Sequence, residues 1–358
     1  MKRTCQLAVF VLSAVAVSPL AHGQGCVVAR SNGETGGPQS EGGYLMPGEF
    51  NFSTGYRHQF SFRHFIGPAE QTQRIALGTE VENKINLENL SLTYQLTSRF
   101  SVTANVPILT ASRHSNNSAA IQFAKGIGDT SFLVSGWLWN PKENTRGNVQ
   151  FGFGLQIPTG NDDIVTITDA LTGKGPTPTT DDYSIQPGSG GYGIIFQWAA
   201  FKNVRSTQLY FNGSYLATPQ NTNNVLRSAT SSNQPLTAYN SISDQYLLEA
   251  GIAVPVKKIA GLTLTFGPRF EGVPANDLIG DSLGFRRPGF ALSIEPGFQY
   301  FHGGHSFSAS VGKAMYRDRT KSVPDVMLNG HGDAAFADYV WLASYSFRFD
   351  PFHRHHKS

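Results

Sequence analysis

The chain has 358 residues, among them 38 Gly, 25 Phe and 13 Tyr, and only 15% of its residues are charged. This charged fraction lies below the roughly 25% of soluble globular proteins, yet the aromatic content excludes a disordered chain. The formal net charge of +3 is too small to indicate a nucleic-acid partner, and a mean hydropathy of -0.22 excludes a bundle of membrane helices.

Residues 1–23 have the pattern of a secretory signal peptide. Lys2 and Arg3 precede an apolar run from Leu7 to Leu20, which is shorter than the roughly 20 residues of a membrane helix. We therefore expect cleavage before Gln24 and export of the chain. The Gly-rich residues 24–47 are predicted to form a periplasmic segment or to enter the interior of the domain that follows.

Residues 48–349 consist of long segments in which apolar side chains alternate with small or polar ones. In residues 148–159, for example, Val149, Phe151 and Phe153 alternate with Gln150, Gly152 and Gly154. A period of two predicts strands. Twelve are predicted, at 49–65, 85–96, 100–111, 128–139, 148–158, 191–202, 206–217, 244–256, 260–272, 286–301, 305–317 and 336–349.

The connections between these segments alternate between short and long. Short ones include 97–99 and 302–304, whereas long ones include 159–190 and 218–243. A soluble β-sandwich also has alternating strands, but soluble strands average roughly five or six residues. Long strands, alternating loop lengths and an even strand count instead predict an all-β fold: a transmembrane antiparallel up-and-down β-barrel in the bacterial outer membrane.

The face opposite the apolar stripe of each strand is predicted to line the barrel lumen. Four arginines on this face can balance four carboxylates, since charges in a low-dielectric interior must be paired or hydrated. The predicted lumen-lining residues are Arg57, Arg63, Asp129, Glu249, Arg269, Glu271, Glu295 and Arg348. Two interpretations remain open: the pairs fill a narrow barrel, or they border a path for solutes.

Three short Gly-rich motifs give the chain a resemblance to a known family. They are Gly126-Ile127-Gly128-Asp129, the run from Gly154 to Asn161, and Gln186-Pro187-Gly188-Ser189-Gly190-Gly191. With them, the chain resembles the outer-membrane proteins named for the meta-pathway of phenol degradation, which are labelled transporters. The resemblance implies a barrel that admits small hydrophobic or aromatic compounds, and it confers no catalytic residue.

Pro268 and Pro296 interrupt two neighbouring predicted strands on the lipid-facing side. Each removes an N–H group from the strand pairing. One interpretation is a pair of β-bulges that adjust curvature. The other is a lateral opening through which an apolar solute leaves the lumen for the membrane.

Outer-membrane barrels include lipid hydrolases, so an enzymatic function is an alternative. His114 and Ser115 are the nearest candidates for a base and a nucleophile, but neighbouring strand residues face opposite ways. The tail at 350–358 contains His353, His355 and His356 among cationic neighbours, which favours a solvated periplasmic tail over a metal site.

The sequence thus predicts an outer-membrane barrel, not an enzyme, that allows passive passage of small solutes. No catalytic, cofactor or metal site is predicted. The expected partners are outer-membrane lipids, the barrel-assembly machinery and a small-molecule solute, with no nucleic acid and with the oligomeric state left open. The alternative is a structural or surface-interaction barrel with a filled lumen, and a lipid hydrolase ranks below both.

Overall fold

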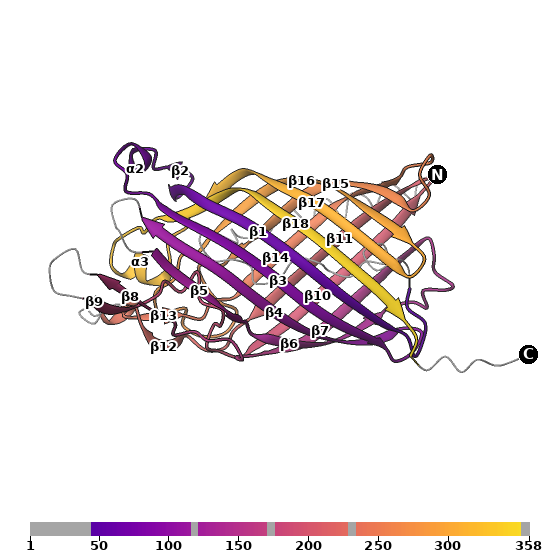
Figure 1. Cartoon of the computed structure of the whole chain (residues 1–358), viewed down its shortest axis with the longest axis horizontal. Helices are drawn as coiled ribbons and strands as arrows, with labels where there is room; N and C mark the ends of the chain where they lie inside the picture. Colours follow the sequence, from indigo (N-terminus) through magenta and orange to yellow (C-terminus); the bar gives the residue numbers. More distant parts are fainter. Residues whose placement is uncertain (1–43, 116–120, 170–175, 228–233, 352–358) are drawn as a thin grey trace, which may run out of the picture.

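The computed structural model describes residues 44–115, 121–169, 176–227 and 234–351. Within these residues, twelve antiparallel strands form one closed barrel, which confirms the predicted fold class and strand number (Figure 1). The predicted signal peptide, residues 24–43 and the three tail histidines lie outside the described residues.

The barrel wall follows the order of the chain, each strand pairing with its neighbours in sequence. The wall strands are β1 (Phe50–Ile66), β3 (Val81–Gln95), β4 (Phe100–Ser115), β5 (Ile121–Ile127) continued by β6 (Thr130–Trp137), β7 (Gly147–Ile157), β10 (Gly193–Val204), β11 (Thr207–Ala217), β14 (Gln245–Pro255), β15 (Leu262–Val273), β16 (Gly289–His302), β17 (His305–Asp318) and β18 (Ala334–Phe349). The last strand pairs with the first, from Phe50 opposite Phe349 to Phe65 opposite Ala334, so the sheet has no open edge at this seam.

Exposure along the strands is opposite to that of a soluble protein. In β7, Phe151, Phe153 and Leu155 are 46, 60 and 55% exposed, whereas the alternating Gly152 and Gly154 are buried. Large apolar groups therefore point out of the barrel and small groups point inward. This is the arrangement of a barrel whose outer face contacts lipid.

Short turns lie at one end of the barrel and long connections at the other (Figure 1). We call these the short-turn end and the long-loop end. The long connections contain β2 (Ala69–Glu70), α2 (Gln73–Ala76), β8 (Val165–Asp169), β9 (Pro176–Thr180), β12 (Thr222–Leu226), η2 (Pro235–Thr237), β13 (Tyr239–Ser241) and α3 (Val323–Met327). Among the described residues, no helix has the length and apolar content to cross a membrane.

The fourth strand differs from its predicted bounds of 128–139. It begins earlier, at Ile121 in β5, and is interrupted at Gly128 and Asp129 before β6. A Cβ atom on Gly128 would lie 2.9 Å from Pro107 Cγ and 3.0 Å from the Pro187 carbonyl oxygen. The strand breaks because a long connection crosses it here, a tertiary contact that periodicity does not reveal.

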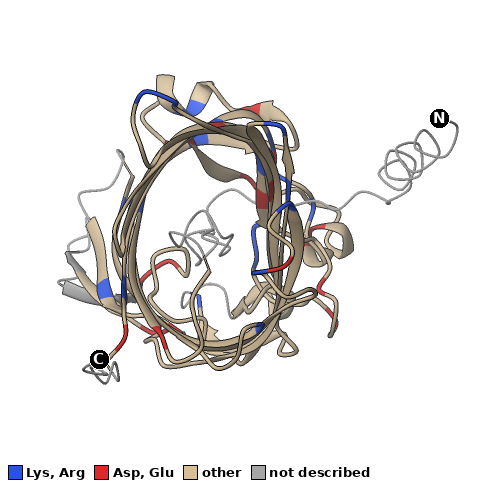
Figure 2. Cartoon of the chain, turned by 90° about the vertical axis from the view of Figure 1, so that its right-hand side faces the viewer, with Lys and Arg blue, Asp and Glu red and all other residues tan. Residues whose placement is uncertain are grey.

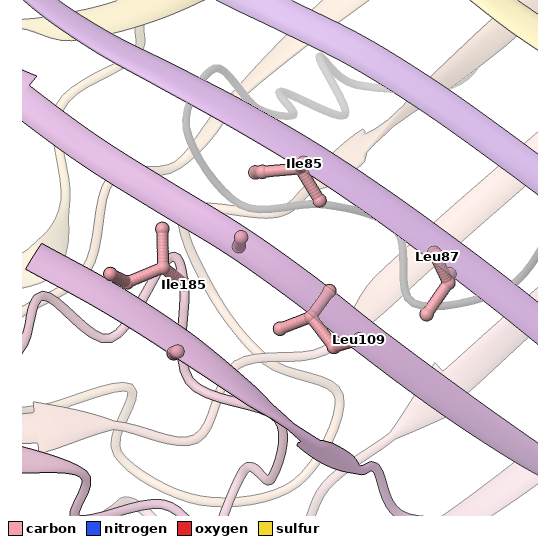
Figure 3. Packing of buried hydrophobic residues seen from close by; sticks show 6 residues of the cluster. Ile85, Leu87, Leu109 and Ile185 are labelled. Atoms are coloured by element: carbon pink, nitrogen blue, oxygen red, sulfur yellow. The ribbon is translucent and has the colours of Figure 1, made fainter.

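A hydrophobic cluster lies inside the barrel near the long-loop end. Ile85, Leu87 and Leu109 on the inner face of β3 and β4 are buried together with Ile185, which belongs to the connection between β9 and β10 (Figure 3). The Ile185 side chain is 0% exposed. Part of this connection is therefore folded into the barrel and packed against the wall.

Candidate functional site in the barrel interior

Arg57 on β1 and Glu271 on β15 form an ion pair across the barrel interior. Three strands, β16, β17 and β18, separate these two in the wall, so the contact spans the interior. The two guanidinium Nη atoms of Arg57 donate to the two carboxylate oxygens of Glu271 at 2.9 and 2.7 Å. Arg57 also donates to Gln59 Oε1 at 3.0 Å. A paired fork of this kind is geometrically specific.

Arg269 joins three carboxylates to the same network. It donates to Glu271 from Nε and Nη2 at 3.0 and 2.9 Å, pairs with Glu249 on β14, and lies 3.4 Å from Glu295 on β16. Ser310 donates to Glu295 at 2.6 Å. Two guanidinium groups and three carboxylates meet here, so the network has one net negative charge when all five groups are ionised.

Three of the eight predicted lumen residues lie outside this network. Arg63 pairs with Glu70 and Asp338 at 2.5 and 2.7 Å near the long-loop end, where its side chain is 30% exposed. Arg348, near the other end, donates to the Tyr44 carbonyl oxygen at 3.2 Å. Asp129 has a different role.

Asp129 holds together the three Gly-rich motifs of the sequence. Its carboxylate accepts hydrogen bonds from the Ser189 backbone N–H at 2.7 Å, the Ser189 hydroxyl at 2.6 Å and the Gly160 N–H at 3.1 Å. A Cβ atom on Gly160 would lie 2.6 Å from the Gly188 Cα atom, so only glycine allows the two backbones to approach this closely. The motifs thus fix the connection before β10 to the ends of β5 and β7.

Ion pairs anchor the same connection within the long-loop end. Asp182 accepts two hydrogen bonds from Arg287 at 2.8 and 2.6 Å and lies 3.5 Å from Arg113. Burial by itself would raise the pKa of Asp182, but the two arginines and the Ser184 hydroxyl hold that pKa well below its usual range. We call Asp182 to Ile185, with these partners, the loop cap.

Further buried ion pairs surround the loop cap. Arg286 and Asp277 are 0 and 1% exposed and pair at 2.5 Å, and Arg319 pairs with Asp325 at 3.0 Å. Asp325 also completes the N-terminal capping box of α3 with Ser322. Each pair lies within one long loop, but Arg286 also donates to Ser241 Oγ at 2.6 Å and Arg319 lies 3.4 Å from the Arg286 carbonyl oxygen. These two contacts connect separate long loops, so this end of the barrel is a packed layer.

Aromatic packing occurs at the opposite, short-turn end. Tyr44 lies before β1, yet its ring contacts Trp137 on β6 and Phe201 on β10, with centroid distances of 5.3 and 6.5 Å. Trp137 and Phe201 are buried, at 7 and 8% exposure. The described end of the 24–47 segment therefore reaches strands on other parts of the wall.

The pairing of β15 with β16 is continuous past both prolines, with Pro268 opposite Ile294 and Pro296 opposite Phe266. Pairing lapses on their other sides. Between β14 and β15, the pair of Glu249 with Arg269 is followed by the pair of Ile252 with Phe266, and the residues between these two pairs are unpaired. Between β16 and β17, the residues between the pair of Ile294 with Lys313 and the pair of Gly297 with Ser310 are likewise unpaired. The register is the same before and after each lapse, and the bulge between β16 and β17 lies at Leu292–Ser293 instead.

His114 and Ser115 are the last two residues of the extended strand β4. The chain does not turn between them, so their side chains leave the strand on opposite faces. They would act together as base and nucleophile only if the chain turned between them, and it does not.

Sequence reasoning missed the residues of the loop cap. Asp182 and Ile185 fall in a predicted external loop, 159–190, where a polar composition indicated only a surface connection. The sequence feature that could have indicated them is the pair Tyr183 and Ile185 next to the Gly-rich motif, since large apolar side chains in a loop tend to pack against another surface.

No protein-family model matches the sequence, and no curated protein matches it. Among solved structures, the chain is similar to the COG4313 outer membrane channel from Pseudomonas putida F1, with a TM-score of 0.59 and 14% identity over 88% of this chain and 100% of that chain. Weaker likenesses include the translocator domain of the autotransporter NalP from Neisseria meningitidis, with a TM-score of 0.43 and 12% identity over 85% of this chain and 90% of that one. Another is the P. putida toluene transporter TodX, with a TM-score of 0.39 and 10% identity over 85% of this chain and 91% of that one. The first likeness shows that this chain has the fold of an outer-membrane barrel.

Proposed function

We propose that this protein allows the passive passage of small solutes across the bacterial outer membrane. The observation that carries the proposal is the inner wall of β3, β4, β17 and β18, which bears small polar side chains. Ser91 donates to Asn105 at 2.6 Å, and Ser308 and Ser344 share a hydrogen bond of 2.6 Å. These residues face inward, yet they are only half-buried, which supports a solvent-accessible interior.

The charged network is the proposed constriction of this path. Arg57, Glu271 and Arg269 cross the interior, and Glu249 and Glu295 add the excess negative charge. A ring of carboxylates favours cations over anions in a narrow aqueous pore. A modest cation preference is therefore expected for ions, whereas neutral solutes would be limited mainly by size.

The solute class is proposed to be aromatic or hydrophobic. This proposal rests on the resemblance to the family named for the meta-pathway of phenol degradation, in which we propose to place this chain. The solved Pseudomonas putida F1 protein of the same fold is described as an outer membrane channel. We propose no enzymatic activity.

A lateral opening is the proposed exit for an apolar solute. Its support is the interruption of strand pairing beside Pro268 and Pro296, since an incomplete ladder in the lipid-facing wall is costly for backbone groups that lipid cannot hydrogen-bond. Strands that are not held by a complete ladder separate more easily than fully paired ones.

A barrel with a filled lumen is the second candidate, and the loop cap favours it. Ile185 and the buried pair of Arg286 with Asp277 occupy the long-loop end. In this alternative the long loops serve surface interactions and nothing crosses. Membrane lipids around the wall and recognition of β18 by the barrel-assembly machinery are proposed for both candidates.

Planar-bilayer conductance of the purified full chain tests the function. We expect discrete steps with a cation preference that falls in Glu249→Gln and Glu295→Gln variants. Liposome uptake of a small aromatic solute should be measured alongside. If the correctly folded protein showed neither conductance nor uptake, the result would favour the second candidate, a filled barrel whose loops serve surface interactions.

A further inference from the structure

Glu88 and Lys313 carry opposite charges on the outer wall of the barrel, where lipid is expected. Glu88 on β3 follows Leu87, whose side chain is buried inside, and Lys313 on β17 follows Gly312, which faces the interior network. Both charged side chains therefore point outward, and both are exposed. Within the described residues, neither has an ion-pair or hydrogen-bond partner.

Apolar and aromatic side chains surround both charges. Glu88 lies opposite Tyr56 on one side and Ile108 on the other, and Lys313 lies opposite Ile294 and Tyr339. Outward charges within the apolar band of a membrane barrel are destabilising when only lipid surrounds them. A protein partner at the same depth would remove this penalty.

The two charges lie at nearly the same level in the membrane. From Glu88 the pairing leads directly across the wall through Tyr56 and Ala343 to Ala309. Because the strands are tilted, this path of three strand spacings moves toward the short-turn end by roughly 9 Å (Figure 1). Lys313 lies four residues beyond Ala309 toward the long-loop end, which returns roughly 10 Å.

Because Glu88 and Lys313 lie at the same depth, this part of the wall can be complementary to the same part of a second copy. A two-fold axis perpendicular to the membrane preserves depth and exchanges left and right, and such isologous interfaces are common among homo-oligomers. With that axis beside the seam of β1 and β18, Lys313 of one copy faces Glu88 of the other, and the reverse pair forms as well. Figure 2, viewed along the barrel, shows that the strands form one closed ring.

The surface between the two charges has the composition of an interface. Trp341 and Tyr56 are 52 and 39% exposed, and both lie on the seam. The Tyr56 hydroxyl donates to Asn86 Oδ1 at 2.7 Å, and His58 Nδ1 lies 2.8 Å from the same oxygen. Aromatic anchors with a small polar cluster are typical of protein contacts, and lipid cannot supply the remaining hydrogen bonds.

We infer that this protein forms a two-fold dimer in the membrane through the seam of β1 and β18, with reciprocal ion pairs between Glu88 and Lys313. The occupant of the surface is a second copy of the chain, because the surface has its own complementary charges at one depth. The inference is independent of which solute crosses the barrel.

The test is a charge exchange in the purified full chain, with mass measured by native mass spectrometry and light scattering in lipid nanodiscs and detergent. Glu88→Lys and Lys313→Glu should each raise the dimer dissociation constant at least tenfold. The double variant should restore it, because the reversed charges again meet as opposites. Lys202→Glu, an exposed site on β10, is the matched control and should leave the dimer unchanged.

Heat-modified gel mobility should accompany each variant to show that the barrel has folded. A wild-type chain that stays monomeric at all concentrations, with or without lipopolysaccharide, overturns the inference. So does a folded double variant that fails to recover the dimer when the single variants have lost it.

Discussion

Arg57 and Glu271, which are 214 positions apart in the chain, form a two-pronged ion pair across the interior of the barrel. Both side chains are largely shielded, at 2 and 11% exposure. Removing one partner of such a pair leaves a charge without compensation, which costs more than the intact pair contributes. The network is therefore the part of the lumen most sensitive to single substitutions.

Glu271→Gln is expected to lower the free energy of unfolding by about 3 kcal/mol, since Arg57 and Arg269 would lose a shared counter-charge. Urea unfolding of the protein in lipid vesicles would measure the loss. Glu143→Gln, an exposed site in a short turn, should change stability by about 0.5 kcal/mol or less. Equal losses in the two variants would contradict the structural role of the network.

Gly160→Ala is expected to destabilise the junction of the three motifs by about 1–3 kcal/mol. The added methyl group would lie 2.6 Å from Gly188 Cα, where backbone must move. Gly330→Ala is the matched control, because a Cβ atom there would have the Asp325 carbonyl oxygen as its nearest neighbour, at 3.9 Å. Unfolding free energies would separate the two variants, and a tolerated Gly160→Ala would argue against the observed close approach.

Ile185→Ala is expected to loosen the loop cap. The substitution leaves a cavity against the inner wall, with a cost of about 2 kcal/mol or more for a buried isoleucine. Hydrogen exchange in residues 181–192 should accelerate, and single-channel conductance should rise if the cap restricts the lumen. Ile167→Ala, at a side chain that is 71% exposed, should change neither quantity.

Acidification is expected to release the loop cap. The pKa of Asp182 is lower in the folded protein than in the unfolded chain, so its ion pairs stabilise the cap fully above the unfolded value of about 3.9. That stabilisation is lost as the pH falls below this value toward the folded pKa. Hydrogen exchange of residues 181–187 measured from pH 6 to pH 2 would follow the change.

Asp182→Asn provides the comparison for this pH experiment. It should exchange rapidly at all pH values, because no charge remains to be neutralised. A wild-type cap that stays protected through pH 2 would show that packing, rather than the ion pairs, holds it.

Pro268→Val and Pro296→Val are expected to complete the strand pairing and to slow uptake of an apolar aromatic solute into liposomes. Conductance of small ions should be unchanged, because the central path is not altered. Leu264→Val, on the outward face of β15, is a suitable control for side-chain size. Unchanged aromatic uptake in both proline variants would rule out the lateral opening.

The strand number and the direction of each side chain were predictable because a period of two is a local property. Phe151, Phe153 and Leu155 alternate with glycine in the sequence, and the same alternation places them outside the barrel. The same alternation predicted that Arg57, Glu249, Arg269, Glu271 and Glu295 line the lumen; the structure pairs these five with one another, and their lining of a solute path stays a prediction. Their type and face follow from strand position alone.

The partners of those charges depended on the tertiary structure. Arg57 meets Glu271 because twelve strands close with one particular stagger, and a change of two residues in any register would bring other side chains into contact. The inward fold of Asp182 and Ile185 likewise depends on contacts with distant strands. The outward charges Glu88 and Lys313 show the same division: the sequence by itself determined their faces, whereas the tilt and closure of the barrel decided their common depth.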